Sequence, residues 1–448
     1  MHTEFMRQRF AEAGADDALV WRDRVFSYEH MQSELAGMSR LLDEREFPLG
    51  SVVSVEADFS PRAVALLLAL IDRACIIVPL SSTIESKIPE FRETADVELK
   101  IAVDEQDNVA ISATGTVASH PILVELKEKG HPGLVLFSSG STGKNKAAVH
   151  DLVPMLEKYK VRRHSLRMIT FLLFDHIGGI NTLLYNLSNV GCTVTVNDRS
   201  PESICEAIER YRVELLPTSP TFLNLMLASQ AYEKHDLSSL KTITYGTEVM
   251  PKSTLDRLHS LFPEVRLLQT YGLSEVGILR SKSKSSDSLW VKVGGEGFET
   301  RVVDNLLEIK AKSAMLGYLN APSPFTDDGW FKTGDAVEVD GEYIKILGRT
   351  SEIINVGGEK VYPAEVESVL QMMDDVEEAV VTGEPHPLTG NIVAARVRLT
   401  SGESLAEFRR RMRKHCSGQL NRFKIPQKVT IVESALHGER YKKIRLAT

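Results

Sequence analysis

The chain has 448 residues, of which 43% are hydrophobic and 25% charged, and its formal net charge at pH 7 is -8. This length is too great for one compact core, so we expect at least two domains of ordinary globular composition. The acidic balance argues against a general nucleic-acid binder, which would carry a basic excess, but it allows a local cation cluster that binds a nucleotide.

The first elements in chain order alternate between strand and helix. Residues 51–57, "SVVSVEA", predict a strand, and residues 75–80, "CIIVPL", predict another. Between them, "SPRAVALLLALIDRA" predicts a helix with Ser60 as its cap and Pro61 in its first turn. This strand–helix–strand order favours a parallel sheet. Charges at both ends of the apolar run exclude a bilayer span, which needs about 20 nearly uncharged residues.

The same alternation returns further along the chain. Strands are predicted at residues 133–137, 191–196, 213–219, 240–246 and 265–272, and helices at residues 200–212, 219–230 and 250–263. The polar run "SKSKSSDS", residues 281–288, is expected to be a surface loop. We therefore expect the α/β class, with a large N-terminal domain built from βαβ-type sheets.

After about Trp290 the pattern changes to short strands separated by Gly and Asp turns, which indicates a β-rich subdomain. Within it, "DAVEVDGEYIKI" predicts a hairpin that turns at Asp340-Gly341. Past Arg349 a smaller α+β unit follows, with helices near residues 363–373 and 404–416. We place the domains at 1–348 and 349–448.

The four cysteines are scattered and form no C-x-x-C pair. This pattern argues against a disulfide framework or a zinc site and favours buried, reduced thiols in a cytoplasmic protein. The N-terminus is charged and is not followed by an apolar core, so no signal peptide is expected.

One loop concentrates small hydroxyls, glycines and lysines. It reads "LFSSGSTGKNKAAVH", residues 136–150, and follows a predicted strand. Glycines allow backbone N–H groups to converge, hydroxyls donate further hydrogen bonds and lysine supplies charge, so the loop predicts a phosphate cradle. It is not a standard P-loop, because with Gly143-Lys144 as the G-K pair the first glycine falls on Ser138 and the final Ser/Thr on Asn145.

Four segments in the right order resemble the adenylate-forming superfamily, which includes acyl-CoA synthetases, peptide-synthetase adenylation domains and luciferases. "SSGSTGKNK" is similar to its SSG[ST]TGxPK motif, and "YGLSEVG" is similar to its YGxTE motif. "GWFKTGDAVEVDGEYIKILGRTSEIINVGGEKVYPAEVE", residues 329–367, resembles its longest block, and residues 21–80 resemble its N-terminal region. The resemblance spans nearly the whole chain.

The resemblance implies a set of ATP- and magnesium-binding positions. The loop would wrap the β- and γ-phosphates of ATP through Ser138, Ser139, Gly140, Ser141, Thr142, Gly143 and Lys146. Tyr271 would stack on adenine and Gly246 would line the base. Ser274 would reach the α-phosphate, and Glu275 would hold Mg²⁺, a hard cation that prefers oxygen ligands. Asp335 would accept hydrogen bonds from the ribose hydroxyls, and Arg349 would assist at the ribose or phosphate.

For the acid, the resemblance implies a pocket beside "LLFDHIGGINTLL", where His176 is the candidate lining residue. Amino-acid-activating relatives place an Asp near here, but the equivalent position is Ile177, although Asp175 lies close by. A substrate without an α-amine is therefore favoured. In the second step, Gly357 and Gly358 would permit close approach of a pantetheine arm, after rotation of a mobile C-terminal domain near Ser351.

The catalytic lysine is implied by the last motif, PxTxxGKxxR. The tail "LHGERYKKIRLAT" has neither the Pro nor the Gly in register. Lys442 keeps the K-x-x-R spacing to Arg445 and is preferred, while Lys443 fits if the alignment slips by one.

These features imply an ATP-dependent acid–thiol ligase that forms an acyl-adenylate and pyrophosphate from a fatty or aryl acid. Coenzyme A is the favoured acceptor. The phosphopantetheine of a carrier protein, loaded with an acyl or amino acid, is the alternative. A third possibility is a degenerate ATP-binding homologue, and a kinase or P-loop ATPase is disfavoured. Neither nucleic acid nor a membrane span is expected, and a homodimer is left open.

Overall fold

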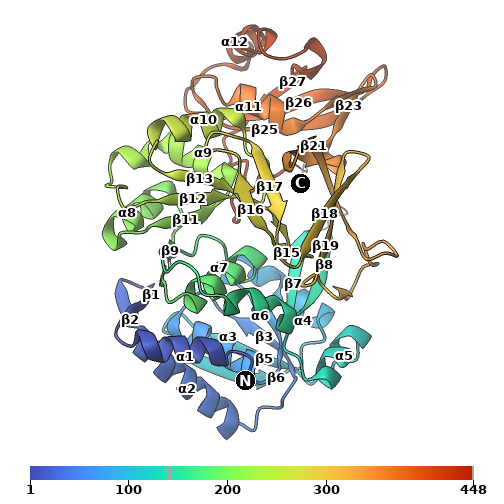
Figure 1. The fold of residues 1–448 in the computed structure, drawn as a ribbon. Coiled ribbons are helices and arrows are strands. Elements are labelled where there is room, and N and C mark those ends of the chain that lie inside the picture. Colours follow the sequence, from blue (N-terminus) through green and yellow to red (C-terminus); the bar gives the residue numbers. More distant parts are fainter. Residues whose placement is uncertain (140–143, 446–448) are drawn as a thin grey trace.

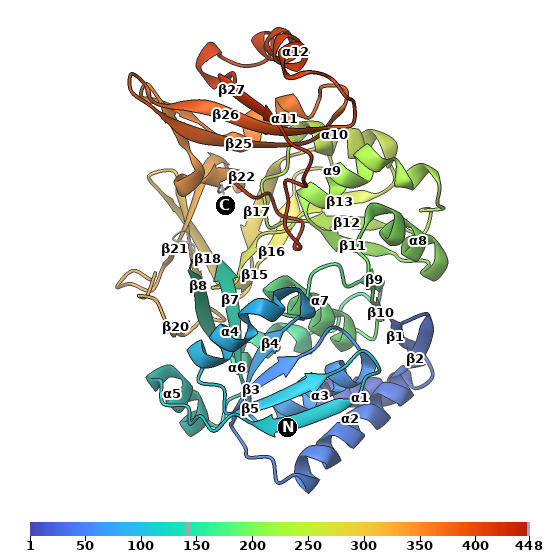
Figure 2. The same ribbon diagram turned by 180° about the vertical axis from the view of Figure 1, so that it is seen from behind.

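A computed structural model of the protein describes residues 1–139 and 144–445. Three sheets with their helices form the main body, and a fourth sheet forms a smaller unit at the C-terminal end (Figure 1). Figure 2 shows the last residues leaving this smaller unit and running back into the main body. Within the described residues, no helix combines the length and the apolar character needed to cross a membrane.

The first sheet contains the predicted βαβ unit. In spatial order its strands are β20 (Gly317–Tyr318), β8 (Asn145–Asp151), β7 (Gly133–Ser139), β4 (Ile76–Leu80), β3 (Val52–Glu56), β5 (Leu99–Val103) and β6 (Val109–Ala113). β7, β4, β3 and β5 run parallel. Its surrounding helices are α1 (Glu4–Ala13), α2 (Tyr28–Glu44), α3 (Pro61–Asp72), η1 (Ser82–Lys87), α4 (Ile88–Thr94), α5 (Pro121–Lys129), α6 (Leu152–Lys160) and α7 (Ile177–Ser188).

The predicted start of α3 is confirmed. The Ser60 side chain accepts a hydrogen bond from the backbone N–H of Ala63, and Pro61 occupies the first turn. Ten of the twelve residues of this helix are buried, because it packs between the sheet and the neighbouring helices. The apolar run is thus a core helix.

The second sheet is also mainly parallel. Its spatial order is β13 (Arg266–Gln269), β12 (Thr242–Tyr245), β11 (Leu215–Thr218), β9 (Arg167–Ile169), β10 (Cys192–Val194), β1 (Asp17–Trp21) and β2 (Arg24–Ser27). Only β2 at the edge is antiparallel. The associated helices are α8 (Pro201–Tyr211), α9 (Pro220–Ser229), η2 (Ala231–Glu233) and α10 (Lys252–Leu261). The strand–helix alternation predicted for residues 191–272 is confirmed.

The third sheet is antiparallel and forms the predicted β-rich part. Its order is β16 (Arg280–Ser283), β17 (Trp290–Gly294), β22 (Tyr343–Arg349), β21 (Phe331–Asp340), β19 (Leu306–Ala311) and β18 (Phe298–Val303). The short pair β14 (Gly272–Leu273) and β15 (Gly277–Ile278) lies beside it. β21 and β22 form the hairpin predicted at Asp340-Gly341, and Gly341 supplies the positive φ of 60° that its turn requires.

The prediction of a surface loop at residues 281–288 is wrong for residues 281–283. Ser281 to Ser283 belong to the edge strand β16, which pairs with β17. The hydroxyls of Ser281 and Ser283 accept hydrogen bonds from the backbone N–H groups of Tyr271 and Gln269. The alternating Ser and Lys residues form an edge strand: the serine side chains are hydrogen-bonded and the lysine side chains face solvent. In sequence, such a strand resembles a polar loop.

The fourth sheet belongs to the C-terminal unit. Its strands are β24 (Glu359–Val361), β23 (Ile354–Val356), β26 (Gly390–Leu399), β25 (Val376–His386) and β27 (Lys428–Ile431). Its helices are η3 (Thr350–Glu352), α11 (Pro363–Leu370), α12 (Leu405–Ser417) and η4 (Arg422–Lys424). The chain passes from the third sheet to the fourth between Arg349 and Ile354. All four cysteines are buried and free, as predicted.

Candidate active site

Several of the predicted site residues follow the carboxyl ends of strands of the second sheet. The parallel strands β11 and β12 end just before Ser219 and Gly246, and β13 ends two residues before Tyr271. Ligands of open parallel sheets bind beyond the carboxyl ends of the strands. At Gly246 the backbone passes so close to Thr270 that an added Cβ would lie 2.7 Å from its Oγ1. A side chain there would narrow the space at this edge.

Tyr271, Asp335 and Arg349 form one hydrogen-bonded group. Asp335 and Arg349 face each other across the β21–β22 pair, and Arg349 Nε lies 3.4 Å from Asp335 Oδ1. The Tyr271 hydroxyl donates to Asp335 Oδ2. Burial raises the pKa of Asp335, an effect that the Arg349 charge opposes. Burial and the Asp335 charge raise the pKa of Tyr271 well above its usual value, so its hydroxyl stays protonated and remains a donor.

Glu275 lies beside the strand pair that frames the predicted phosphate loop. Its Oε1 accepts a hydrogen bond of 2.7 Å from the Tyr318 hydroxyl and a long one of 3.5 Å from Ser138 Oγ. Lys146 Nζ lies 5.1 Å from the centroid of the Tyr318 ring. These groups meet because β20, β8 and β7 are neighbours in the first sheet.

The phosphate loop itself is described only at its two ends. Ser138 pairs with Lys146, and Ser139 with Asn145, in the antiparallel β7–β8 ladder. Gly140, Ser141, Thr142 and Gly143 lie outside the described residues. The ladder brings the two ends of the loop together next to Glu275, which is the position that a phosphate cradle at this site requires.

The side chain of His150 holds the loop that carries Ser274. His150 Nε2 lies 2.5 Å from the Ser274 carbonyl oxygen, to which it donates. His150 is fully buried, and burial lowers its pKa to about 4. The ring is therefore neutral near pH 7 and acts as a fixed hydrogen-bond donor to the backbone between Tyr271 and Glu275.

The C-terminal tail reaches the same site. Residues 439–443, here called the lysine segment, run beside the ends of β11 and β12 (Figure 2). Lys442 reaches a small cavity of about 10 Å³ between the main body and the C-terminal tail, which is lined by Phe171, Leu172, Leu173, His176, Arg199, Arg440 and Lys442. Burial lowers the pKa of Lys442 to about 8, although the nearby Glu248 carboxylate acts in the opposite direction.

His176 is the N-cap of α7, and its Nδ1 accepts a hydrogen bond of 3.0 Å from the Gly178 N–H. Burial, together with the charges of Lys442 and Arg440, holds the pKa of His176 well below its usual value. The imidazole is therefore neutral, and its ring forms part of the wall of the cavity that Lys442 enters.

The structure places Lys443 away from this cavity. Lys443 Nζ lies 2.7 Å from Glu367 Oε2, and Arg445 Nη2 lies 2.9 Å from the same oxygen. Glu367 is 1% exposed and belongs to α11 of the C-terminal unit. Of the two candidate lysines, Lys442 thus faces the site while Lys443 ties the tail to the C-terminal unit.

Tyr441 stands where the resembling motif has glycine, and its backbone has a positive φ of 50°. This conformation is unfavourable for a bulky residue and needs support from its surroundings. The Tyr441 ring packs on Phe171 and Phe222 at centroid distances of 5.3 and 5.4 Å, and Ser219 Oγ donates to its carbonyl oxygen. Tyr441 therefore adopts a left-handed backbone conformation, which glycine favours, with support from its neighbours.

Gly357 and Gly358 are not brought together with the other candidates. They form the exposed turn between β23 and β24, where their positive φ values of 61° and 92° suit glycine. Their hydrogen bonds reach Thr389 and Asn355 within the C-terminal unit. Of the described residues of the C-terminal unit, only those of the lysine segment line the cavity.

Three residues at or next to the site, Tyr318, Arg199 and Glu367, were not identified from the sequence. Tyr318 and Arg199 lie in stretches without a motif, and only the fold brings them to Glu275 and Tyr441. Glu367 carries a usable signal, because residues 363, 366, 367 and 370 share one helix face that is otherwise apolar. A charged residue on such a face implies a buried partner.

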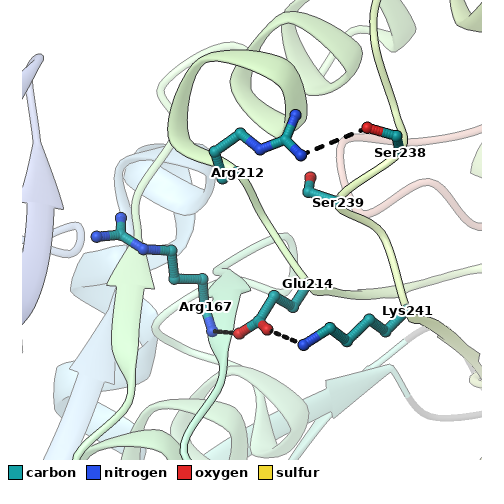
Figure 3. Close-up of a pocket in the computed structure, with 6 residues that line it drawn as sticks. All are labelled: Arg167, Arg212, Glu214, Ser238, Ser239 and Lys241. Atoms are coloured by element: carbon teal, nitrogen blue, oxygen red, sulfur yellow. Dashed lines mark hydrogen bonds and ion pairs between the residues drawn. The ribbon is translucent and has the colours of Figure 1, made fainter.

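A separate depression of about 470 Å³ lies at the opposite edge of the second sheet (Figure 3). It is lined by Arg167, Arg212, Glu214, Ser238, Ser239 and Lys241. Its charges are already paired, since Glu214 accepts from Lys241 and from the Arg167 backbone, and Arg212 pairs with Asp236. It also lies at the amino ends of β9, β11 and β12, so we do not assign the active site there.

Comparison with known proteins identifies the family. Residues 6–311 match the family model of the AMP-binding enzyme, and residues 365–443 match that of the AMP-binding enzyme C-terminal domain. An indoleacetate–CoA ligase of Aromatoleum aromaticum is 29% identical over 330 residues, which cover 67% of this chain and 64% of the relative. The chain thus spans less than two thirds of that protein. A 4-coumarate–CoA ligase-like protein of Oryza sativa is 27% identical over 393 residues, 82% of this chain and 70% of the relative.

Solved structures share the fold. The anthranilate CoA ligase AuaEII, in complex with anthranoyl-AMP, superposes with a TM-score of 0.82 at 18% identity and covers 99% of this chain and 95% of its own. The o-succinylbenzoate CoA synthetase of Bacillus subtilis gives 0.75 at 20% identity, covering 98% and 96%. The two family matches, which include most of the chain, show that it belongs to the AMP-binding, adenylate-forming enzyme family.

Proposed function

We propose that the protein is an AMP-forming acid–thiol ligase that activates a carboxylic acid with ATP and transfers the acyl group to a thiol. The observation that carries the proposal is the position of Lys442 in a cavity next to His176, near enough to Arg349 and Glu275 for their charges to act on its ammonium group. Membership of the family supports it, as do the names of the two curated relatives, which are CoA ligases.

In the first step, the acid carboxylate attacks the α-phosphorus of ATP. A carboxylate–phosphorus bond forms, the bond to the bridging oxygen breaks, and pyrophosphate leaves. An anion must approach a polyanion, so positioning and charge neutralisation dominate over covalent catalysis. Lys442, Lys146 and Arg349 are cations that the described residues offer near this site. In the second step a thiol attacks the acyl carbon, loses its proton, and AMP departs.

The nucleoside end of ATP is assigned to the group around Asp335. Its carboxylate retains acceptor capacity beyond the bonds to Tyr271 and Arg349, because each carboxylate oxygen can accept more than one hydrogen bond. The two ribose hydroxyls are suitable donors. The resemblance assigns adenine to Tyr271 and Gly246, and both residues follow the carboxyl ends of neighbouring strands of the second sheet.

Glu275 is the assigned magnesium residue, and its chemistry fits. Both of its hydrogen bonds in the described residues reach Oε1, which leaves Oε2 for a cation. No group of three potential metal ligands is present among the described His, Cys, Asp and Glu residues. A single carboxylate that shares the ion with phosphate oxygens is the usual magnesium arrangement in nucleotide sites. When bound, magnesium would neutralise phosphate charge.

For the substrate we favour an apolar acid, with an aryl acid ahead of a fatty acid. The carbon surface at the cavity comes from Phe171, Leu172 and Leu173, and the neutral ring of His176 completes it. Asp175 is paired with Arg440, so it does not offer a free carboxylate to an α-amine. The indoleacetate and 4-coumarate names of the relatives point in the same direction.

The rate of adenylation should fall as the pH rises through about 8. Burial lowers the pKa of Lys442 to about 8, so the cation that bridges the two anions is present below this pH and lost above it. The pH profile of kcat/KM for ATP reports the free enzyme and should show this alkaline limb. Lys442→Arg, which stays cationic, should lower the rate but remove the limb. An identical alkaline limb in both proteins would contradict the assignment.

The proposal is tested by product analysis with a panel of acids, ATP and Mg²⁺, each with and without coenzyme A. We expect AMP and pyrophosphate with one class of acid, and an acyl-CoA thioester when coenzyme A is present. Adenylate formation without thioester would favour a carrier protein as acceptor. ATP binding without pyrophosphate would favour a non-catalytic homologue, a reading to which the tyrosine at the glycine position of the lysine motif gives some support.

A further inference from the structure

We propose that Asp175 is a positioning residue, whose buried ion pair with Arg440 fixes the lysine segment so that Lys442 enters the cavity. The inference about the reaction rests on the proposed function. The inference about where the segment lies rests on contacts alone. Sequence comparison gives Asp175 no role, because the position that binds the substrate amine in amino-acid-activating relatives falls on Ile177.

The Asp175–Arg440 pair joins the main body directly to the C-terminal tail. Arg440 Nη2 lies 2.8 Å from Asp175 Oδ2, and the Asp175 side chain is only 2% exposed. Its Oδ1 is buried and accepts no hydrogen bond from the described residues. A buried carboxylate without a cation is strongly unfavourable, so Asp175 holds Arg440 in place. Asp175 immediately precedes His176, and Arg440 lies two residues before Lys442.

The lysine segment has no helix or strand of its own, but a single β-bridge between His437 and Lys443 closes it into a turn. Contacts with the main body fix where this turn lies. Arg199 donates to the Glu439 carbonyl oxygen at 3.0 Å, and its guanidinium lies 5.8 Å from the Tyr441 ring centroid. On the far side, the Lys443 N–H donates to Glu248 Oε1 at 2.7 Å. Consecutive residues around Lys442 are therefore each held by the main body.

Among the contacts of the segment with the main body given above, the Asp175–Arg440 pair is the one buried ion pair. The others that bind the segment to the main body are backbone hydrogen bonds and aromatic packing. A displacement of about 1 Å at a reacting group can reduce a rate by about 10²-fold. Loss of the pair should therefore affect the step that uses Lys442 and spare the step that does not.

The test compares Asp175→Asn and Arg440→Gln with the wild-type protein. Asn keeps the size of Asp but removes its charge. Arg440→Lys retains the charge and should behave close to wild type. The matched control is Asp72→Asn, which removes a carboxylate of similar burial, 7% exposed and 2.8 Å from Arg7, far from the lysine segment. Any general cost of losing a buried carboxylate appears in this control.

Two readouts are needed. Hydrogen exchange of residues 437–445 in the free protein reports whether the segment is held, and needs no substrate. Acid-dependent ATP–pyrophosphate exchange and thioester formation from supplied acyl-adenylate report the two half-reactions. For Asp175→Asn and Arg440→Gln we expect faster segment exchange and adenylation reduced by about 10- to 10²-fold, with thioester formation unchanged. Asp72→Asn should change neither the segment exchange nor the ratio of the half-reactions.

Unchanged segment exchange in Asp175→Asn and Arg440→Gln overturns the proposal, whatever the activity. Faster exchange with equal loss in both half-reactions overturns the positioning role. If the wild-type protein makes no pyrophosphate with any acid, the proposed function fails, and the segment exchange alone then decides whether the pair holds the tail.

Discussion

Lys442→Ala should reduce adenylation by about 10²–10³-fold while leaving thioester formation from supplied acyl-adenylate largely intact. Removing a group that stabilises charge only in the transition state commonly has an effect of this size. The lysine side chain shares the cavity with His176 and with two other cations, Arg199 and Arg440. The measurement is single-turnover kinetics of each half-reaction with purified protein, together with a melting curve. Because Lys442 makes no ion pair among the described residues, its loss should leave the melting temperature nearly unchanged.

Lys443→Ala is the matched control for this prediction. Its ammonium group contacts Glu367 and not the cavity, so the variant should lose stability but keep adenylation within a few-fold of wild type per folded molecule. The opposite pattern, with adenylation lost in Lys443→Ala and kept in Lys442→Ala, would reverse the assignment of the two lysines. Equal loss of both half-reactions in Lys442→Ala would also count against it.

Glu367→Gln should lower the free energy of unfolding by about 3–5 kcal/mol, the usual result of breaking a buried ion pair from one side. Glu367 is buried between Lys443 and Arg445, and it also accepts a hydrogen bond of 2.9 Å from the Val381 N–H. The neutral amide would leave Lys443 without its counter-charge and Arg445 with only the longer contact of 3.5 Å to Glu352. Urea denaturation followed by the signal of the C-terminal unit measures the change.

Glu365→Gln provides the comparison in the same helix. Glu365 pairs with Lys424 but its side chain is 43% exposed, so this substitution should change the free energy of unfolding by at most about 1 kcal/mol. Similar losses in the two variants would show that the Glu367 pair contributes no more than a surface pair.

The Glu367 pair also gives a pH dependence. Burial acts to raise its pKa, but the charges of Lys443 and Arg445 outweigh it, so the pKa in the folded protein lies below the ordinary value. The contribution to stability is therefore complete above the unfolded pKa, about 4.3, and is lost as the pH falls through the folded pKa. Glu367→Gln should flatten this acid limb of the stability curve.

Much of the fold could be predicted from local patterns. The helix from Pro61 begins where its cap predicts, and the hairpin turns at Gly341, because both depend on residues adjacent in sequence. The strand of residues 280–283 could not be predicted. Its serine hydroxyls accept hydrogen bonds from the backbone N–H groups of Gln269 and Tyr271. These partners are distant enough that only the assembled sheets show which residues meet.

The site divides in the same way. The motifs locate Tyr271, Glu275 and Asp335 in sequence, and the structure brings each of them to one edge. The sequence did not distinguish Lys442 from Lys443 as the catalytic lysine. The distinction depends on the ion pair of Lys443 with Glu367, which is 76 residues away in sequence. It also depends on the left-handed backbone conformation of Tyr441. Asp175 and Arg440 carry no motif, and only the docking of the tail shows that they meet.

The central claim is that ATP and an acid react at the site that Lys442 enters. Acid-dependent exchange of labelled pyrophosphate into ATP, measured in the wild-type protein and in Lys442→Ala, tests it most directly. We expect exchange that requires both acid and Mg²⁺ in the wild-type protein and that is about 10²–10³-fold slower in the variant. Release of ADP or phosphate, or exchange that is independent of the acid and of Lys442, would contradict it.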